Sequence, residues 1–204
     1  TGMSVYSPMF GVIYNPRSIH WSDYEPVTDS NGNIRQFEPA LGVATNVLWS
    51  FYQKGNDDYT DRINGLVSLK YEFTDWLSLQ GRYGLDHYSR ETTQWYNPGA
   101  SGLTRTNGGD GKYVVSNNSF TEVNADFLLV AQKDNLFDSK FSGSLSLGGN
   151  IMNRQTKNLS STALGFIIPG LYNLSNSEDP ITSSNSYYNK QMQSIYAFGQ
   201  LSYD

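Results

Sequence analysis

The chain has 204 residues, a formal net charge of -5 and a pI near 4.9. This acidic balance, without a basic stripe, excludes a nucleic-acid-binding surface. The absence of cysteine excludes disulfides, cysteine-based zinc sites and thiol catalysis. Only 38% of the residues are hydrophobic, yet 14% are aromatic, which is typical of β-proteins with polar loops and of transmembrane β-barrels.

No membrane-spanning helix is expected, because no window approaches the run of about 18 apolar residues that such a helix needs. The chain also opens without the charged start and apolar stretch of a signal peptide. We therefore expect any export signal to lie upstream or to have been removed. Residues 1–60 are predicted to form an extracellular loop region that leads into the first strand.

A β-hairpin is predicted over residues 61–88. From Ile63 to Phe73 the odd positions are apolar, while the even positions are polar with the exception of Leu66. Thr74-Asp75 then forms a tight turn, and the alternation resumes from Leu77. Two alternating runs around a two-residue gap are typical of antiparallel strands.

The same pattern predicts a second hairpin over residues 120–152, with a short turn at 134–138, and a last strand over about 191–203. The fold class is therefore all-β, with five antiparallel up-and-down strands. The links at 89–119 and 153–190 are long and rich in Asn, Ser, Gly and Tyr.

Short turns that alternate with long polar loops favour an outer-membrane barrel over a compact soluble domain. In such a barrel the short turns face the periplasm, and aromatic residues near them form an interfacial girdle, here Tyr71, Phe73 and Trp76. The alternative is a secreted or surface β-sandwich that binds glycan or serves as an adhesive module.

Several segments resemble the barrel of SusC/RagA-type TonB-dependent transporters, and together they span essentially the whole chain. The segments are Asn15–Ser18 with Asp29–Gly32, Asn56–Gly65, Leu69–Leu79, Gly81–Asp86, Ile168–Asn176 and Tyr196–Tyr203. The resemblance implies a barrel of about 22 strands with a plug domain, in the outer membrane of Bacteroidetes-type bacteria. It also implies import of a glycan or peptide, with TonB and a SusD-like lipoprotein as partners. Because no plug or TonB box is present in this chain, we expect an excised middle portion of the barrel or a truncated gene product.

The function expected from this resemblance is nutrient uptake, most simply of oligosaccharides, by ligand capture followed by displacement of the plug. Sugar rings stack on aromatic side chains, and aromatic residues occur at the ends of the long loops and within them. The predicted ligand contacts are Trp49, Tyr52, Trp95, Tyr96 and Tyr172. Anchoring in the girdle or packing of the loops on themselves explains the same residues.

Catalytic, metal and cofactor sites are not predicted. His20 and His87 lack a metal-ligand pattern, the acidic residues Asp57, Asp58 and Asp61 lack calcium-loop spacing, and Asn107–Gly111 is expected to be a flexible loop tip. The charged residues on the even positions are predicted to line a polar wall inside the barrel, where they would pair with one another or brace the plug: Lys70, Glu72, Arg82, Asp86 and Asp126.

Overall fold

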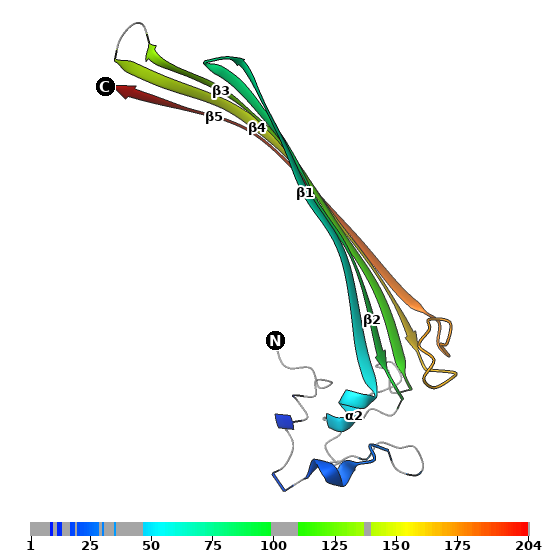
Figure 1. The fold of residues 1–204 in the computed structure, drawn as a ribbon. Coiled ribbons are helices and arrows are strands. Elements are labelled where there is room, and N and C mark those ends of the chain that lie inside the picture. The colour runs from blue at the N-terminus through cyan, green and yellow to red at the C-terminus, as the bar shows by residue number, and fades with distance from the viewer. Residues whose placement is uncertain are drawn as a thin grey trace. The chain divides into compact units, whose positions relative to one another are not determined.

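The structure is a computed structural model that describes residues 47–98, 110–136 and 140–203, together with residues 9, 12–13, 17–18, 20–28, 30 and 35. It contains a 3-10 helix, η1 (Trp21–Tyr24), and a short helix, α2 (Val47–Tyr52). Five strands follow (Figure 1): β1 (Lys54–Thr74), β2 (Leu77–Tyr96), β3 (Lys112–Leu136), β4 (Phe141–Leu164) and β5 (Thr182–Tyr203). Within the described ranges, no helix has the length and hydropathy to cross a membrane.

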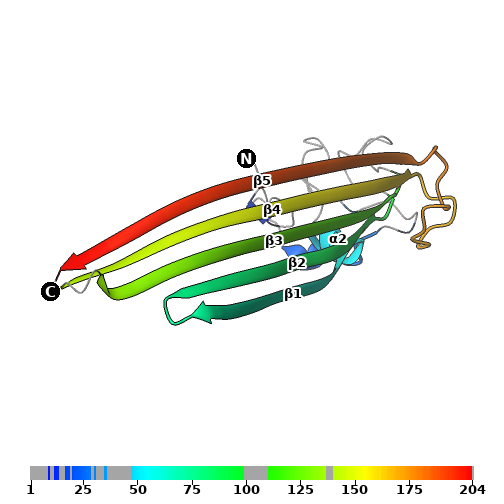
Figure 2. The same cartoon turned by 90° about the horizontal axis from the view of Figure 1, so that it is seen from above.

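The five strands form one sheet in the order of the chain, so that each strand pairs with its sequence neighbours (Figure 2). The predicted all-β, up-and-down arrangement is therefore confirmed. A β-sandwich would require a second sheet packed on the apolar face, whereas the described strands belong to a single sheet whose edges are β1 and β5.

Cross-strand contacts show that even-numbered residues share one face of the sheet and odd-numbered residues the other. On the even face, ion pairs join β1 to β2, β2 to β3 and β3 to β4, and the ring of Tyr196 on β5 covers Gly148 on β4. On the odd face, Phe127 covers Gly149, and the rings of Phe141 and Tyr203 lie 4.9 Å apart. This parity is the consequence of the two-residue side-chain period of a β-strand.

The strands are longer than the sequence pattern predicted. β2 continues to Tyr96 and β3 begins at Lys112, so the predicted loop 89–119 is reduced to residues 97–111. The predicted loop 153–190 is likewise reduced to residues 165–181, and β1 begins at Lys54 inside the predicted loop region 1–60. The added strand segments are polar at most positions on both faces, so they lack the apolar alternation that predicted the other parts of the strands.

The turn between β1 and β2 at Asp75-Trp76 is short, as predicted. Of the second short turn, predicted at 134–138, residues 134–136 are the end of β3, and residues 137–139 lie outside the described residues. The predicted loop tip Asn107–Gly109 and the resemblance residues Asn15, Pro16, Asp29, Asn31 and Gly32 also lie outside them.

Most apolar residues on the odd face occupy the half of each strand nearest the short turns. In β1 they cover residues 63–73, in β2 77–85, in β3 123–131, in β4 141–151 and in β5 195–203. The odd positions beyond these bands are mostly polar, for example His87 to Thr93 on β2 and Asn153 to Lys157 on β4. We call these five segments the apolar band.

The chain divides into two compact units. The first comprises Thr1–Tyr59, Glu91–Asn117 and Leu159–Asn185, and contains the buried apolar residues Val47, Trp49, Ala163 and Phe166. The second comprises Thr60–Arg90, Asn118–Asn158 and Ser186–Asp204, and contains the apolar band. In the second unit large apolar side chains are exposed on the odd face, such as Leu69 at 74% and Ile195 at 84%.

Candidate functional site

Four aromatic side chains meet in the first unit, where the long connections begin and end. The ring centroid of Tyr172 lies 5.1 Å from that of Trp95, 6.0 Å from that of Phe166 and 6.5 Å from that of Tyr113. These separations fall within the range of attractive ring contacts. The four residues come from the end of β2, the start of β3 and the connection 165–181, and we call them the aromatic cluster.

Two glycines leave space for the rings of this cluster. The ring of Trp95 lies against Gly55 at the start of β1, so closely that a Cβ atom there would overlap the ring. A Cβ atom at Gly111 would lie 2.6 Å from the Phe166 ring, and the φ of 100° at Gly111 also favours glycine. The rings therefore pack directly on backbone.

Polar groups at the edge of the cluster connect it to α2 and β1. The Tyr172 hydroxyl donates to Asn97 Oδ1 at 3.0 Å. Asn97 in turn donates to Gln53 twice, from its side-chain Nδ2 to Oε1 at 2.7 Å and from its backbone N–H to the carbonyl at 2.8 Å. The neighbouring Lys54 is partly buried, and this desolvation lowers its pKa.

The connection 165–181 is ordered by the buried side chain of Asn176, which is 3% exposed. Its Oδ1 accepts from the Ile168 backbone N–H at 2.9 Å, while its Nδ2 donates to the carbonyls of Ile168 at 2.8 Å and Leu171 at 2.7 Å. Ser177 adds hydrogen bonds to both backbone groups of Leu164. Tyr172 is therefore held in place by hydrogen bonds on both sides of it.

The predicted ligand contacts separate into three groups. Trp95 and Tyr172 lie in contact with each other, and Tyr96 follows Trp95 directly and is partly exposed. Tyr52 is 66% exposed at the end of α2, whereas Trp49 in the same helix is 2% exposed, so its ring offers no face to a ligand. A ligand role for these residues stays a prediction.

Tyr113 and Phe166 were not predicted as members of the site. Tyr113 lies two residues after Gly111, and Phe166 lies in a connection that the sequence predicted as a long polar loop. A glycine near an aromatic residue can indicate that a ring packs on backbone. The sequence does not show, however, which residue across the sheet the ring contacts.

The even face of the second unit carries paired charges. Arg62 donates to both carboxylate oxygens of Asp86 at 2.9 and 2.7 Å, and Arg82 donates to Asp126 at 2.8 Å. Arg154 donates to Glu122 at 2.7 Å, and its guanidinium lies 5.8 Å from the Phe120 ring centroid.

The predicted mutual pairing of these wall residues is confirmed for two of the pairs. Lys70 binds Glu72 at 2.8 Å, and Arg82 binds Asp126, whereas Asp86 pairs with Arg62, which was not predicted. Glu122 and Arg154 were also missed, since polar residues occupy both parities around them. Arg62, Arg82 and Arg154 therefore each have a carboxylate partner on the adjacent strand of the even face.

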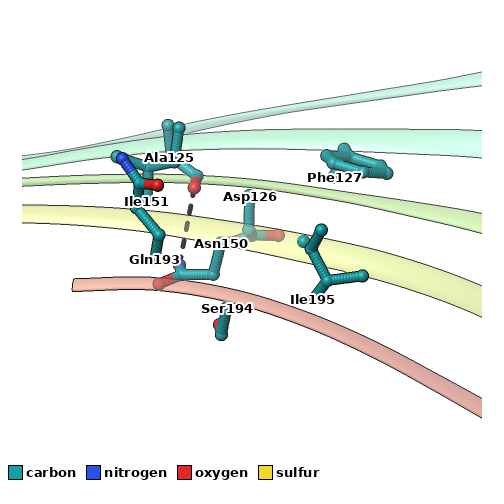
Figure 3. A pocket seen from close by; sticks show the side chains of 9 residues that line it. Ala125, Asp126, Phe127, Asn150, Ile151, Gln193, Ser194 and Ile195 are labelled. Carbon is teal, nitrogen blue, oxygen red and sulfur yellow. Dashed lines mark hydrogen bonds between the residues drawn. The ribbon is translucent and has the colours of Figure 1, made fainter.

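Two apolar hollows lie on the odd face of the described strands. The larger, about 640 Å³, lies between β3, β4 and β5, and Phe127, Ile151 and Ile195 stand around it (Figure 3). In the same view the Asn150 side chain donates to the Ala125 carbonyl at 3.4 Å. The smaller hollow, about 380 Å³, lies nearer the short turns of the same three strands.

Among the residues that the structure describes, no group of three histidine or acidic side chains is placed to hold a metal ion. His87 contacts the Thr121 hydroxyl at 2.8 Å on the adjacent strand. Stacked rings, side-chain amides and paired charges are the groups that the described part of the chain brings together.

No protein-family model matches the chain, and no curated protein matches it either. Solved structures do match. Two structures of the RagAB peptide transporter, one of them in a "closed-closed" state, align with 87% of this chain at a TM-score of 0.72 and 12% sequence identity. The chain spans 20% of the length of the matched chain.

At this identity the likeness shows the fold. The chain is thus similar to a portion of a RagA-type barrel, as the sequence resemblance implied. The matched proteins are transporters and not enzymes.

Proposed function

We propose that the chain forms part of the wall of a TonB-dependent importer in the outer membrane. One observation carries the proposal. All five strands bear an apolar stretch of nine or eleven residues on the odd face, next to the short turns. A transmembrane β-strand needs about 9–11 residues to cross the hydrocarbon core, so the length of the apolar band matches one crossing.

The two faces have the chemistry that this location requires. Lipid would cover the odd face, where Leu69, Ile195 and Leu201 are more than two-thirds exposed. The even face would line the lumen, where its paired arginines and carboxylates would contact water or solute. The edges at β1 and β5 would pair with further strands, because five strands are too few to close a barrel.

The length of the strands and the position of the short turns define which end of the barrel wall faces the outside of the cell. The strands have 20 to 25 residues, about twice what one crossing needs. With the short turns at the periplasmic end, the polar halves of the strands would extend into the medium outside the cell. Two members of the aromatic cluster, Trp95 and Tyr113, belong to these polar ends of β2 and β3.

The ligand that we propose is a polar oligomer, captured by the aromatic cluster and the amides of Asn97 and Gln53. Stacked rings and amide groups suit the flat C–H faces and hydroxyls of an oligosaccharide, as the sequence suggested. The likeness to a peptide importer favours a peptide instead. By the same resemblance, we propose a SusD-like lipoprotein and TonB as partners, and displacement of a plug as the step that opens the lumen.

Cysteine labelling tests whether lipid covers the apolar band on the odd face, and the chain has no native cysteine. In cells, a membrane-impermeant maleimide should label Gln191→Cys, which lies on the odd face beyond the apolar band. Leu201→Cys, on the same strand and face but within the band, should be protected by lipid. Equal labelling of the two variants would contradict the proposal.

Binding measurements on the intact transporter test the ligand site. Trp95→Ala should weaken binding of the ligand that is taken up, measured by titration with an oligosaccharide mixture and, separately, with a peptide mixture. Tyr187→Ala, an exposed aromatic residue outside the cluster, is the matched control. Unchanged affinity in the Trp95 variant would remove Trp95 as a contact while leaving the barrel assignment intact.

A further inference from the structure

We propose that the smaller hollow on the odd face binds a glycerophospholipid of the inner leaflet, with an acyl chain in the hollow and the phosphate beside Lys133. The inference rests on the proposed function, because only an outer-membrane barrel presents this face to lipid. It goes further by assigning a specific site with a defined headgroup chemistry.

The hollow is formed where small residues face large ones. Ala131 on β3 and Gly143 on β4 leave the space, and Leu145, Leu201 and Trp76 stand around it. Its volume is about 380 Å³, and its lining is mostly apolar. An acyl chain that lies in such a hollow contacts side chains on more than one side, whereas on a flat β-sheet surface it contacts the protein on one side only.

The large residues around the hollow are exposed, so an apolar occupant has surface to cover. Leu145 is 62% exposed, Leu201 69% and Trp76 48%. The Trp76 carbonyl accepts from the Gln132 backbone N–H at 2.8 Å, which fixes the β1–β2 turn beside β3. The indole is therefore held at the edge of the hollow, at the interfacial depth that tryptophan prefers.

Lys133 supplies the charge that selects a phosphate. It lines the hollow two residues beyond Ala131, where the apolar band of β3 ends, three residues before the strand itself ends. Its side chain is exposed, and it makes no ion pair within the described part of the chain. Asp134, the nearest carboxylate in sequence, lines a separate polar hollow with Ser142 and Ser202 on the even face.

A lysine at this position combines an apolar stem with an ammonium group at the membrane surface. The stem can lie along the acyl chain while the ammonium group reaches a phosphodiester oxygen. The larger hollow lacks this combination, since its lining residues include neither lysine nor arginine. We therefore assign the headgroup site to the hollow beside the short turns and not to the larger one.

Native mass spectrometry of the intact, delipidated transporter with added palmitoyl-oleoyl phosphatidylglycerol tests the site. Lys133→Gln should weaken one lipid-binding event about fivefold, since a basic residue at an anionic surface contributes about that factor. Ala131→Leu should abolish the same event by filling the hollow, without changing charge. Lys140→Gln, an exposed lysine at the same turn, should leave lipid binding unchanged.

The two possible failures are distinguishable, because folded barrels keep a compact, heat-sensitive mobility in detergent gels. A compact barrel that retains its full lipid complement in both the Lys133 and Ala131 variants would overturn the lipid site alone. Failure of the wild-type protein to form a compact barrel would overturn the proposed function, and the lipid site with it.

Discussion

The ring of Tyr196 on β5 covers Gly148 on β4, so that a Cβ atom at residue 148 would overlap ring atoms Cε2 and Cζ. The glycine is buried, whereas Tyr196 is 38% exposed on the even face. Phe127 covers Gly149 on the opposite face, where a Cβ atom would lie 2.7 Å from its ring. An aromatic ring therefore packs on β4 from each side at adjacent glycines, and this fixes the pairing of β4 with both of its neighbours.

Gly148→Ala should destabilise the protein by about 1–3 kcal/mol, the usual cost of overpacking a closely packed site. The readout is the thermal unfolding midpoint in detergent. Gly65→Ala is the matched control, because a Cβ atom at Gly65 meets nothing within 4 Å. Equal shifts in the two variants would contradict the contact between Tyr196 and Gly148.

Asn176→Ala should release the connection 165–181, because it removes one acceptor and two donor contacts to the backbone. These hydrogen bonds are part-buried, and a typical intramolecular hydrogen bond contributes about 0.5–1.5 kcal/mol. Hydrogen exchange should increase in residues 165–181 and not in β4. The exposed Asn189→Ala provides the control, and an unchanged exchange rate in Asn176→Ala would count against the described loop structure.

Arg154 and Glu122 should show a small, salt-dependent coupling. Both side chains are partly exposed, at 42% and 24%, so solvent screens the pair, and such pairs contribute about 0.2–1 kcal/mol. A double-mutant cycle with Arg154→Ala and Glu122→Ala measures the coupling, which should fall at high salt. Strictly additive effects would show that the ion pair does not contribute to stability.

Tyr172→Phe should separate the contribution of ring packing in the aromatic cluster from that of the hydrogen bond made by the Tyr172 hydroxyl. It keeps the ring contact with Trp95 and removes the hydrogen bond to Asn97, at a cost of about 0.5–1.5 kcal/mol. Tyr187→Phe should have no measurable effect on the unfolding midpoint, since its hydroxyl makes no such bond in the described structure. A midpoint for Tyr172→Phe that equals wild type would show that ring packing alone holds the cluster.

Much of the fold could be predicted where one face of a strand is apolar. Residues 63–73 and 77–85 have an alternation that a strand with one apolar face explains, and the three-residue gap between them indicates a hairpin. The pairing of Arg82 with Asp126 also follows from charge on the even positions of adjacent strands.

The candidate site was harder to predict from the sequence than the strands were. Trp95 and Tyr172 were predicted separately as ligand contacts, but their contact with Tyr113 and Phe166 depends on the end of β2, the start of β3 and a connection far along the chain. Trp49 carried the same sequence signal as Trp95, yet it is buried in α2.

By itself, the sequence determined the strands of the apolar band, their chain order and the chemistry of each face, because these follow from the two-residue period of the backbone. Only the tertiary structure decided how far the strands continue, since polar segments such as 87–96 and 153–164 give no periodic signal. It also decided which groups meet across the sheet. The Tyr172 hydroxyl and Asn97 are 75 residues apart in sequence and 3.0 Å apart in space, and that proximity depends on strand register, which no local pattern specifies.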